Sequence, residues 1–401
     1  MMQNDASVFH HAMGRSVRLA FFAECVYRIC AIKVKEQYAG ADMRIKSLEY
    51  PALPKELIRA MPCDPVLSKT VQDARQAFHH IIAGTDSRLA VIVGPCSIHD
   101  EKAALEYAQR LSQLRQRYGH CLELIMRVYF EKPRTNIGWK GFVNDPDLNG
   151  TPNLSQGLWR ARHLLCDITR LAVPAAVEFL NVFMPQYIAD LVAWGAIGAR
   201  TSESQIHREL ASSLSCPIGF KNSIQGDIKA AIDAVVAARH PHHFLTIDES
   251  GRIAVAATTG NPDSHIILRG GKTPNFDQNH VRAAIKNLNE AGLPAKLMID
   301  ASHANSLKNP DNQPFVIEAI ADQVEQGCTE IIGVMIESHL VYGRQNLHSN
   351  KTLVYGQSIT DGCIDWATTV RLIRRLAQAV EVRSAKRLYP DLTPAIGLDE
   401  E

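Results

Sequence analysis

The chain has 401 residues, of which 46% are hydrophobic and 21% charged, and its formal net charge at pH 7 is +1. This composition is typical of a folded globular protein with a substantial core and excludes a largely disordered chain. Because the net charge is close to zero, no global field draws the protein to nucleic acid or to membranes, and any attraction for anions must be local.

Cysteine usage indicates a reducing compartment. The nine cysteines are an odd number, they are scattered along the chain, and none of them belongs to a CxxC pair. Secreted proteins that depend on disulfides show the opposite pattern. We therefore expect the protein in the cytoplasm.

Residues 1–41 form an N-terminal extension, and its apolar segment 17–34 raises the question of a signal peptide or a membrane span. Arg18, Glu24, Arg28 and Lys33 interrupt this segment, and no small-residue cleavage site follows it. These charges favour an amphipathic helix, or a disordered extension upstream of Met43, over a membrane span.

Residues 42–88 are predicted to form an arm followed by a helix. Pro51 and Pro54 interrupt regular structure in the arm. Apolar residues at helical spacing then predict a helix over 68–82, with Ser68 as its N-cap.

Between residues 89 and 383, short apolar segments alternate with helical ones, which is the pattern of a parallel sheet built from βα units. The predicted strands are residues 89–93, 122–130, 175–179, 196–199, 217–220, 266–268, 296–299 and 331–336. The predicted helices are residues 103–114, 155–171, 185–194, 203–214, 228–238, 280–291, 314–326 and 366–382. Eight alternations predict a (β/α)8 TIM barrel, with an inserted β-hairpin at 244–256 and a C-terminal tail at 384–401.

Charged side chains gather where the second predicted strand opens into a loop, in the segment MRVYFEKPRT at 126–135. Its cations and the hydroxyl of Thr135 are groups that bind phosphate and carboxylate ions. Taken alone, the segment fits a solvated face equally well. The barrel decides between the two, because its chemistry is built where the strands end.

Polar or ionisable residues stand at the ends of the other predicted strands as well. Apart from Glu178, they fall into two groups. One group is cationic and consists of Arg127, Lys132, Arg134, Arg200, Lys221 and Arg269. Burying six unpaired cations would be prohibitive, so their ligands should carry several negative charges. The second group offers thiolate, imidazole and carboxylate donors and consists of Cys96, His303, Glu337 and Asp361. Such donors suit Mn, Fe, Co or Zn rather than Ca or Mg.

The residues at these strand ends belong to longer sequence motifs. They are GPCSIHD at 94–100, MRVYFEKPRT at 126–135, GWKG at 138–141, AIGARTSESQ at 196–205, GFKN at 219–222, HIILRGGK at 265–272, DASHAN at 300–305, GVMIESHL at 333–340 and SITDGCIDW at 358–366. In this order they resemble the aromatic-amino-acid-regulated type I synthases of 3-deoxy-D-arabino-heptulosonate 7-phosphate (DAHP), over residues 42–379.

The resemblance implies the first step of the shikimate pathway, in which phosphoenolpyruvate (PEP), erythrose 4-phosphate and water give DAHP and phosphate. It implies that the metal ligands are Cys96, His303, Glu337 and Asp361. It implies that PEP is bound by Arg127, Arg200, Lys221 and Arg269, with Lys132 near the carboxylate. Lys132, Arg134 and Thr135 match the erythrose 4-phosphate segment.

The catalytic residues expected from this resemblance are Lys132, Glu178, Cys96 and His303. Lys132 would donate a proton to the developing alkoxide. Glu178 would position the attacking water, with a metal-bound water as the alternative. For His99 and His207, structural roles are favoured over proton relay.

The resemblance also implies an aromatic amino-acid inhibitor and a homodimer or homotetramer. The matching regulatory positions are Asp42, Pro185, Gln186, Leu210, Ser215 and Phe244. Leu210 and Phe244 fit ordinary core packing equally well. Residues 223–225 read Ser-Ile-Gln where Gly-Thr-Asp is familiar in the family, which leaves the identity of the inhibitor open.

Three other functions fit less well. The related synthase that joins PEP to arabinose 5-phosphate reads KANRS where this chain reads KPRT at 132–135. A class II aldolase needs a histidine-rich zinc set, which is not found in the sequence. A catalytically silent sensing protein would lack a metal ligand or a PEP-binding cation, and none is missing.

Overall fold

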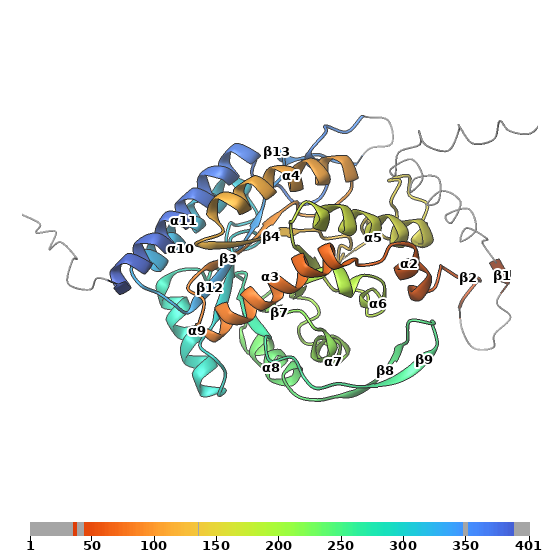
Figure 1. Ribbon diagram of the computed structural model, residues 1–401, viewed down its shortest axis with the longest axis horizontal. Coiled ribbons are helices and arrows are strands. Elements are labelled where there is room, and N and C mark those ends of the chain that lie inside the picture. Colours follow the sequence, from red (N-terminus) through yellow and green to blue (C-terminus); the bar gives the residue numbers. More distant parts are fainter. Residues whose placement is uncertain (1–34, 38–43, 135, 348–351, 389–401) are drawn as a thin grey trace, which may run out of the picture.

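The computed structural model describes residues 35–37, 44–134, 136–347 and 352–388. Within them, eight parallel strands close into a barrel (Figure 1). The barrel strands are β3 (Leu89–Gly94), β4 (Leu122–Arg127), β5 (Ala175–Glu178), β6 (Val192–Ile197), β7 (Ile218–Lys221), β10 (His265–Leu268), β11 (Leu297–Asp300) and β12 (Ile331–Glu337). They pair in chain order and β12 returns to pair with β3, which confirms the predicted (β/α)8 TIM barrel.

Helices surround this barrel (Figure 1). The helices are α2 (Pro54–Ala60), α3 (Pro65–Ala83), α4 (Glu101–Tyr118), α5 (Leu154–Arg170), α6 (Pro185–Ile188), α7 (Gln205–Ser213), α8 (Lys229–Ala238), α9 (Gln278–Glu290), α10 (Gln313–Glu325) and α11 (Trp366–Leu388). Two 3-10 turns, η1 (Ala189–Leu191) and η2 (Pro310–Asn312), follow α6 and precede α10. None of the described helices is long and apolar enough to cross a membrane.

Helix α3 closes the N-terminal end of the barrel. Its Phe78, Ile81 and Ile82 belong to one buried cluster with inward-facing strand residues such as Ile92 and Trp194. The neighbouring strand residues Val91 and Val93 belong instead to the cluster beneath the outer helices, as the period-2 alternation of a strand requires. The open end of the barrel is therefore the opposite one, where the strands have their carboxyl ends.

The start of α3 differs from the prediction. Asp64 is the N-cap, because its carboxylate accepts hydrogen bonds from Val66 N and Leu67 N and Pro65 occupies the first helical position. Ser68 lies inside the helix, so the prediction of Ser68 as the cap was wrong. At the other end, Gly84 adopts the left-handed conformation that ends many helices.

Four further boundaries are corrected by the structure. The helix predicted over 185–194 ends after η1, and β6 begins at Val192 rather than at residue 196. Trp194 is fully buried in the barrel interior, so an apolar run that fits a helix by composition is a strand in this fold. The strand predicted to residue 130 stops at Arg127, and α11 continues to Leu388, beyond the predicted start of the tail.

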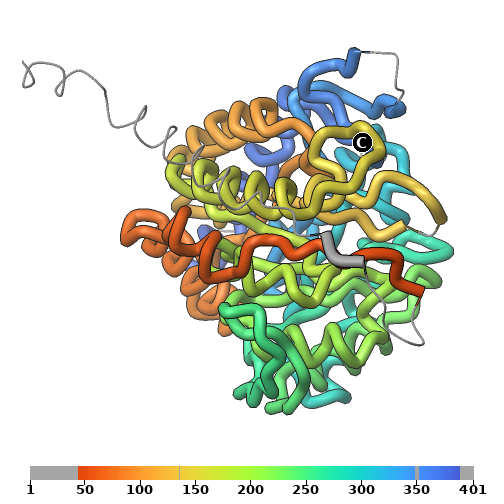
Figure 2. The backbone as a smooth tube through the Cα atoms, turned by 90° about the vertical axis from the view of Figure 1, so that its right-hand side faces the viewer, coloured from red at the N-terminus to blue at the C-terminus, as the bar shows by residue number. Residues whose placement is uncertain are grey.

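The predicted hairpin is present as β8 (His243–Ile247) and β9 (Ile253–Ala257), which pair antiparallel. The N-terminal arm lies against it, since Lys55 N donates a hydrogen bond to Glu249 O at 2.9 Å. Figure 2 shows this arm in red, running over the outside of the barrel. Short pairs that were not predicted are β1 (Lys35–Gln37) with β2 (Ser47–Glu49), and β13 (Val341–Arg344) with β14 (Gln357–Ser358).

Candidate active site at the barrel mouth

A cavity of about 470 Å³ opens at the carboxyl ends of the barrel strands. Most of the predicted site residues line it, namely Lys132, Arg134, Glu178, Arg200, Lys221, Arg269, His303, Glu337 and Asp361. Thr135 lies outside the described residues. The fold thus brings together side chains that are separated by more than two hundred positions in the sequence.

The four predicted metal donors come together on one side of this cavity. Donor atoms of Cys96, Glu337 and Asp361 all lie within 4.8 Å of one another, and Cys96 Sγ is 3.8 Å from Asp361 Oδ2. His303 Nε2 is 4.0 Å from Glu337 Oε1. Cys96 and Glu337 are buried, whereas Asp361 is exposed at the rim.

A buried carboxylate fixes the orientation of His303. Its Nδ1 lies 2.9 Å from Asp300 Oδ2 and 2.8 Å from Ser302 Oγ. This arrangement favours the proton on Nδ1 and leaves the lone pair of Nε2 directed to the other donors. Burial alone would raise the pKa of Asp300, but Lys221, followed by His303, holds it well below its usual value.

Glu337 is held by its backbone and by its carboxylate. Gln313 Nε2 donates to Glu337 O, and Glu337 N donates to Gln313 Oε1, both at 2.9 Å. Arg127 Nη2 lies 3.1 Å from the Glu337 carboxylate. Arg127 itself is 1% exposed and stacks on Tyr129, and among the described residues its Nη1 has no hydrogen-bond partner.

Lys132 reaches from the cation segment to the metal donors. Its Nζ donates to Cys96 Sγ at 3.1 Å and to Cys96 O at 3.3 Å. Burial would lower the pKa of Lys132, but the fields of Cys96, Glu337 and Asp361 raise it, so the ammonium is fully protonated at neutral pH. Burial, followed by the charge of Glu337, raises the pKa of the Cys96 thiol to about 11.

Cations also line the cavity, among them Lys221 and Arg269. Lys221 Nζ lies 2.9 Å from Asp300 Oδ2, and both groups are buried. Arg269 is 7% exposed, and among the described residues its Nε has no hydrogen-bond partner. Burial lowers the pKa of Arg269, and Arg200 lowers it further, while Asp300 opposes this shift. A buried cation with an unpaired donor calls for an anionic ligand.

Glu178 lines the cavity and lies close to Gly198. A Cβ atom at Gly198 would collide with Glu178 Oε1, so only glycine lets the carboxylate lie over the backbone of the β6–α7 loop. The glycine at this position in AIGARTSESQ therefore has a steric reason.

Three residues that line the cavity or hold its side chains in place were not predicted from the sequence. Asp300 opens the DASHAN motif at the end of β11, and its position directly after an apolar strand was a usable signal. Lys308, a further cation on the cavity wall, and Gln313 carry no such signal, because both follow a loop whose path the sequence does not reveal.

The remaining predicted residues lie away from the cavity. His207 is tied to Ser204 Oγ and Leu180 O, each at 2.9 Å, and His99 is buried edge-on to His339. Of the regulatory positions, Pro185 and Gln186 are on α6, Leu210 is on α7, Ser215 follows α7 and Phe244 is on β8. Leu210 is buried and Phe244 half-buried. Asp42 lies outside the described residues.

Comparison with known proteins identifies the family of this chain. The model of the DAHP synthetase I family matches residues 66–374. The Phe-sensitive phospho-2-dehydro-3-deoxyheptonate aldolase of Escherichia coli K12 is 53% identical over 346 residues, covering 86% of this chain and 99% of that protein. The Trp-sensitive protein of the same strain is 49% identical over 342 residues, covering 85% and 98%.

A solved structure agrees with these matches. The phospho-2-dehydro-3-deoxyheptonate aldolase of Francisella tularensis SCHU S4 superposes with a TM-score of 0.83 at 50% identity, covering 84% of this chain and 99% of its own. The fold, the motifs and the length of the match lead to one conclusion. This chain belongs to the DAHP synthetase I family.

Proposed function

We propose that the barrel mouth condenses PEP with erythrose 4-phosphate and water to give DAHP and phosphate. The observation that carries this assignment is one cavity that brings metal donors and buried cations together. Two relatives that are 53% and 50% identical to this chain are named phospho-2-dehydro-3-deoxyheptonate aldolase, and the match covers 99% and 97% of their length. The chain is thus a transferase, a 3-deoxy-7-phosphoheptulonate synthase.

The donor set fits a divalent metal ion, and we propose Mn, Fe, Co or Zn. Thiolate, imidazole and two carboxylates suit borderline cations, while Mg and Ca prefer oxygen ligands alone. Cys96, His303, Glu337 and Asp361 would hold it, and when bound it supplies Lewis acidity toward a substrate carbonyl oxygen.

The cations that line the cavity are suited to PEP, which carries a phosphate and a carboxylate. Arg200, Lys221 and Arg269 would bind these groups, and the unpaired Nε of Arg269 is one donor available for them. Arg127 would bind PEP with these cations through its buried Nη1, which has no partner among the described residues, while its Nη2 holds Glu337 in place. Arg134 and the neighbouring Thr135 would bind the phosphate of erythrose 4-phosphate.

The chemistry then follows from the positions of Lys132 and Glu178. C3 of PEP attacks C1 of the aldehyde, and Lys132 Nζ, which is protonated, gives a proton to the developing alkoxide. Glu178 holds the water that adds to C2 of PEP. The bond between C2 and the phosphate oxygen then breaks, and inorganic phosphate leaves.

Regulation, assembly and location are further parts of the proposal. Relatives named Phe-sensitive and Trp-sensitive suggest feedback inhibition by an aromatic amino acid, with Pro185, Gln186, Leu210, Ser215, Phe244 and Asp42 as candidate contacts. We propose a homodimer or homotetramer in the cytoplasm. The domain boundaries proposed are 1–41, 42–88, 89–383 and 384–401.

Replacing one metal donor tests the assignment. Cys96→Ser should bind the catalytic metal at least 10–100-fold more weakly, the loss that even an outer partner of a metal ligand causes, and should lose turnover. Cys166→Ser, which changes a buried thiol on α5 away from the cavity, is the matched control. Metal titration and steady-state rates measure both. A Cys96→Ser protein with normal metal affinity and rate would overturn the proposed site.

A further inference from the structure

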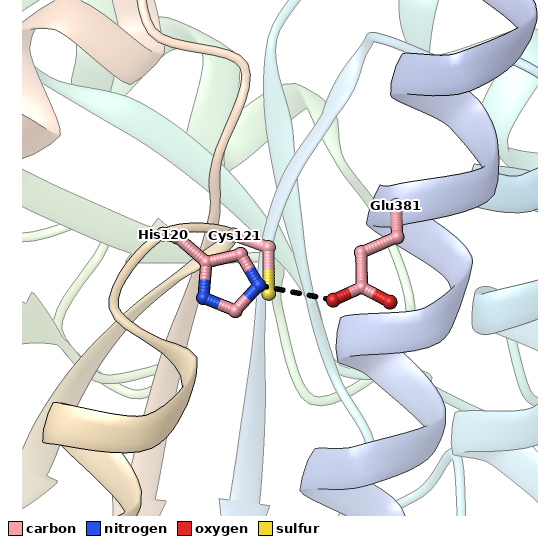
Figure 3. Close-up of side chains that lie close together, drawn as sticks. All are labelled: His120, Cys121 and Glu381. Carbon is pink, nitrogen blue, oxygen red and sulfur yellow. Dashed lines mark hydrogen bonds and ion pairs between the residues drawn. The ribbon is translucent and has the colours of Figure 1, made fainter.

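A second group of metal-type donors lies at the other end of the barrel. His120 and Cys121 form the turn that joins α4 to β4, and Glu381 faces them from α11 (Figure 3). One ligand atom from each of the three residues lies within 4.8 Å of the other two. Because the turn precedes the first residue of β4, the group is separate from the cavity at the strands' carboxyl ends.

The surrounding backbone holds this group in place. Cys121 N donates to Tyr118 O at 3.0 Å, and Leu89 N donates to Cys121 O at 3.1 Å, so the cysteine is anchored to α4 and β3. His120 Nε2 is 3.0 Å from Glu381 Oε1, with side chains 62% and 52% exposed. Cys121 is buried, so the group combines one buried donor with two exposed ones.

We propose that His120, Cys121 and Glu381 bind a divalent cation of the Zn²⁺ class, with water completing its coordination shell. A nitrogen, a sulfur and one carboxylate oxygen match the ligands that tetrahedral zinc takes in proteins. The combination disfavours Mg²⁺ and Ca²⁺, which take oxygen ligands. On binding, the thiol releases its proton to solvent and the imidazole carries its own proton on Nδ1, which leaves Sγ and Nε2 as donors.

Binding of the cation would have to displace the proton of the cysteine. Burial, followed by the charge of Glu381, raises the pKa of the Cys121 thiol to about 11. The thiol is therefore neutral at pH 7, and a bound dication would favour the thiolate. The bound ion would join α11, the last helix of the barrel, to the turn before β4, and would stabilise the closed barrel by mass action.

Counting bound zinc tests the second site. Metal-stripped protein is equilibrated with Zn²⁺ in the presence of a competing chelator, and the retained zinc per chain is measured. His120→Ala and Glu381→Gln should each retain one zinc fewer than the unchanged protein, with turnover unaffected. The barrel mouth contributes equally to all of these proteins, so the difference reports the second site alone.

A matched control removes a similar histidine elsewhere. His163 pairs with Asp167 at 3.3 Å on α5, next to the buried Cys166, and its side chain is 52% exposed. His163→Ala should keep the full zinc count. Equal zinc in the unchanged protein, His120→Ala and Glu381→Gln would overturn the proposal and leave an ordinary His–Glu ion pair. An equal loss in His163→Ala would overturn it as well, because the lost zinc would then be unspecific.

Discussion

Asp300 shows how one buried carboxylate organises a whole site. It is fully buried and lies 2.9 Å both from Lys221 Nζ and from His303 Nδ1, so it neutralises a cation proposed to bind substrate and orients a proposed metal donor. Removing one member of a buried ion pair leaves the other charge uncompensated.

Asp300→Asn should therefore be costly. The change leaves Lys221 buried without its anion, and we expect the free energy of unfolding to fall by roughly 3–5 kcal/mol. Urea denaturation measures it. Asp233→Asn, in the exposed pair with Lys229 at 2.6 Å, is the matched control and should change stability little. Similar losses for the two variants would contradict the role assigned to Asp300.

The proposed role of Lys132 as a proton donor can be tested by a single substitution. Lys132→Met keeps the length of the side chain and removes the ammonium, so we expect kcat to fall by roughly 10²–10⁴-fold, the usual contribution of a positioned proton donor. Steady-state kinetics measure kcat and KM separately. Lys140→Met, on the exposed side of the same loop, should keep normal rates. Full turnover in Lys132→Met would rule out proton donation by this residue.

Sequence reasoning found the residues of the site better than their supports. Cys96 and Glu337 directly follow or end apolar strands, and the carboxyl ends of barrel strands all meet at one mouth. Gln313 acts through a partner that is distant in sequence, so no local pattern marks its contacts. Arg127 was predicted from its place at the end of a strand, but its ion pair with Glu337 joins residues 210 positions apart and could not be predicted from the sequence.

At the scale of elements, α3 is the plug that makes the barrel a closed core. Phe78 contacts Trp194 and His265, with ring centroids 6.3 and 5.3 Å away. Phe78→Ala should cost roughly 3–5 kcal/mol, because it leaves a cavity in a region without exposed atoms. Denaturant unfolding measures this cost. Phe315→Ala, which removes a ring that is 68% exposed, should have a small effect. Equal losses of unfolding free energy in Phe78→Ala and Phe315→Ala would contradict the role of α3 in closing the barrel core.

The first residue of β10 makes the same region sensitive to acid. His265 is buried as a neutral ring, with Nδ1 bonded to Asp263 O and Nε2 facing the Trp194 indole N–H. Burial lowers its pKa to about 4, against about 6.5 in the unfolded chain. The unfolded state therefore binds more protons between these values, and stability is full above pH 6.5 and declines as the pH falls toward 4.

The size of this effect can be measured. His265 should contribute about 1.4 kcal/mol of lost stability for each pH unit within that window. His265→Gln should show a correspondingly shallower decline of the unfolding free energy between pH 6.5 and 4. His163→Gln, which changes an exposed histidine, should keep the original slope. Identical slopes for His265→Gln and the unchanged protein would contradict a buried neutral His265.

The elements themselves were largely predictable, and the errors have physical causes. Helices and strands of the barrel alternate in composition, so their order followed from the sequence. The helix predicted over 185–194 was too long because β6 is apolar on both faces, and such a strand lacks the alternation that identifies strands. The β13–β14 pair was missed because its strands are short and lie in a long loop.

At the scale of the molecule, three regions of the barrel differ in what they contain. Its carboxyl-terminal mouth holds the proposed catalytic cavity, its amino-terminal end is closed by α3, and the arm and hairpin lie on the outside (Figure 1). The chemistry proposed for the mouth is that of a DAHP synthase, in agreement with the family of the chain, and the proposed regulatory positions on α6, α7 and β8 lie on the outer elements.

A phosphate-release assay tests the central claim most directly. The protein is given PEP and one of Mn²⁺, Fe²⁺, Co²⁺ or Zn²⁺, with and without erythrose 4-phosphate, and inorganic phosphate and DAHP are measured together. We expect equal amounts of phosphate and DAHP, formed only when erythrose 4-phosphate and a metal are both present, and abolished by a chelator. Phosphate release that does not require erythrose 4-phosphate, or no release with any of the four metals, would contradict the assignment.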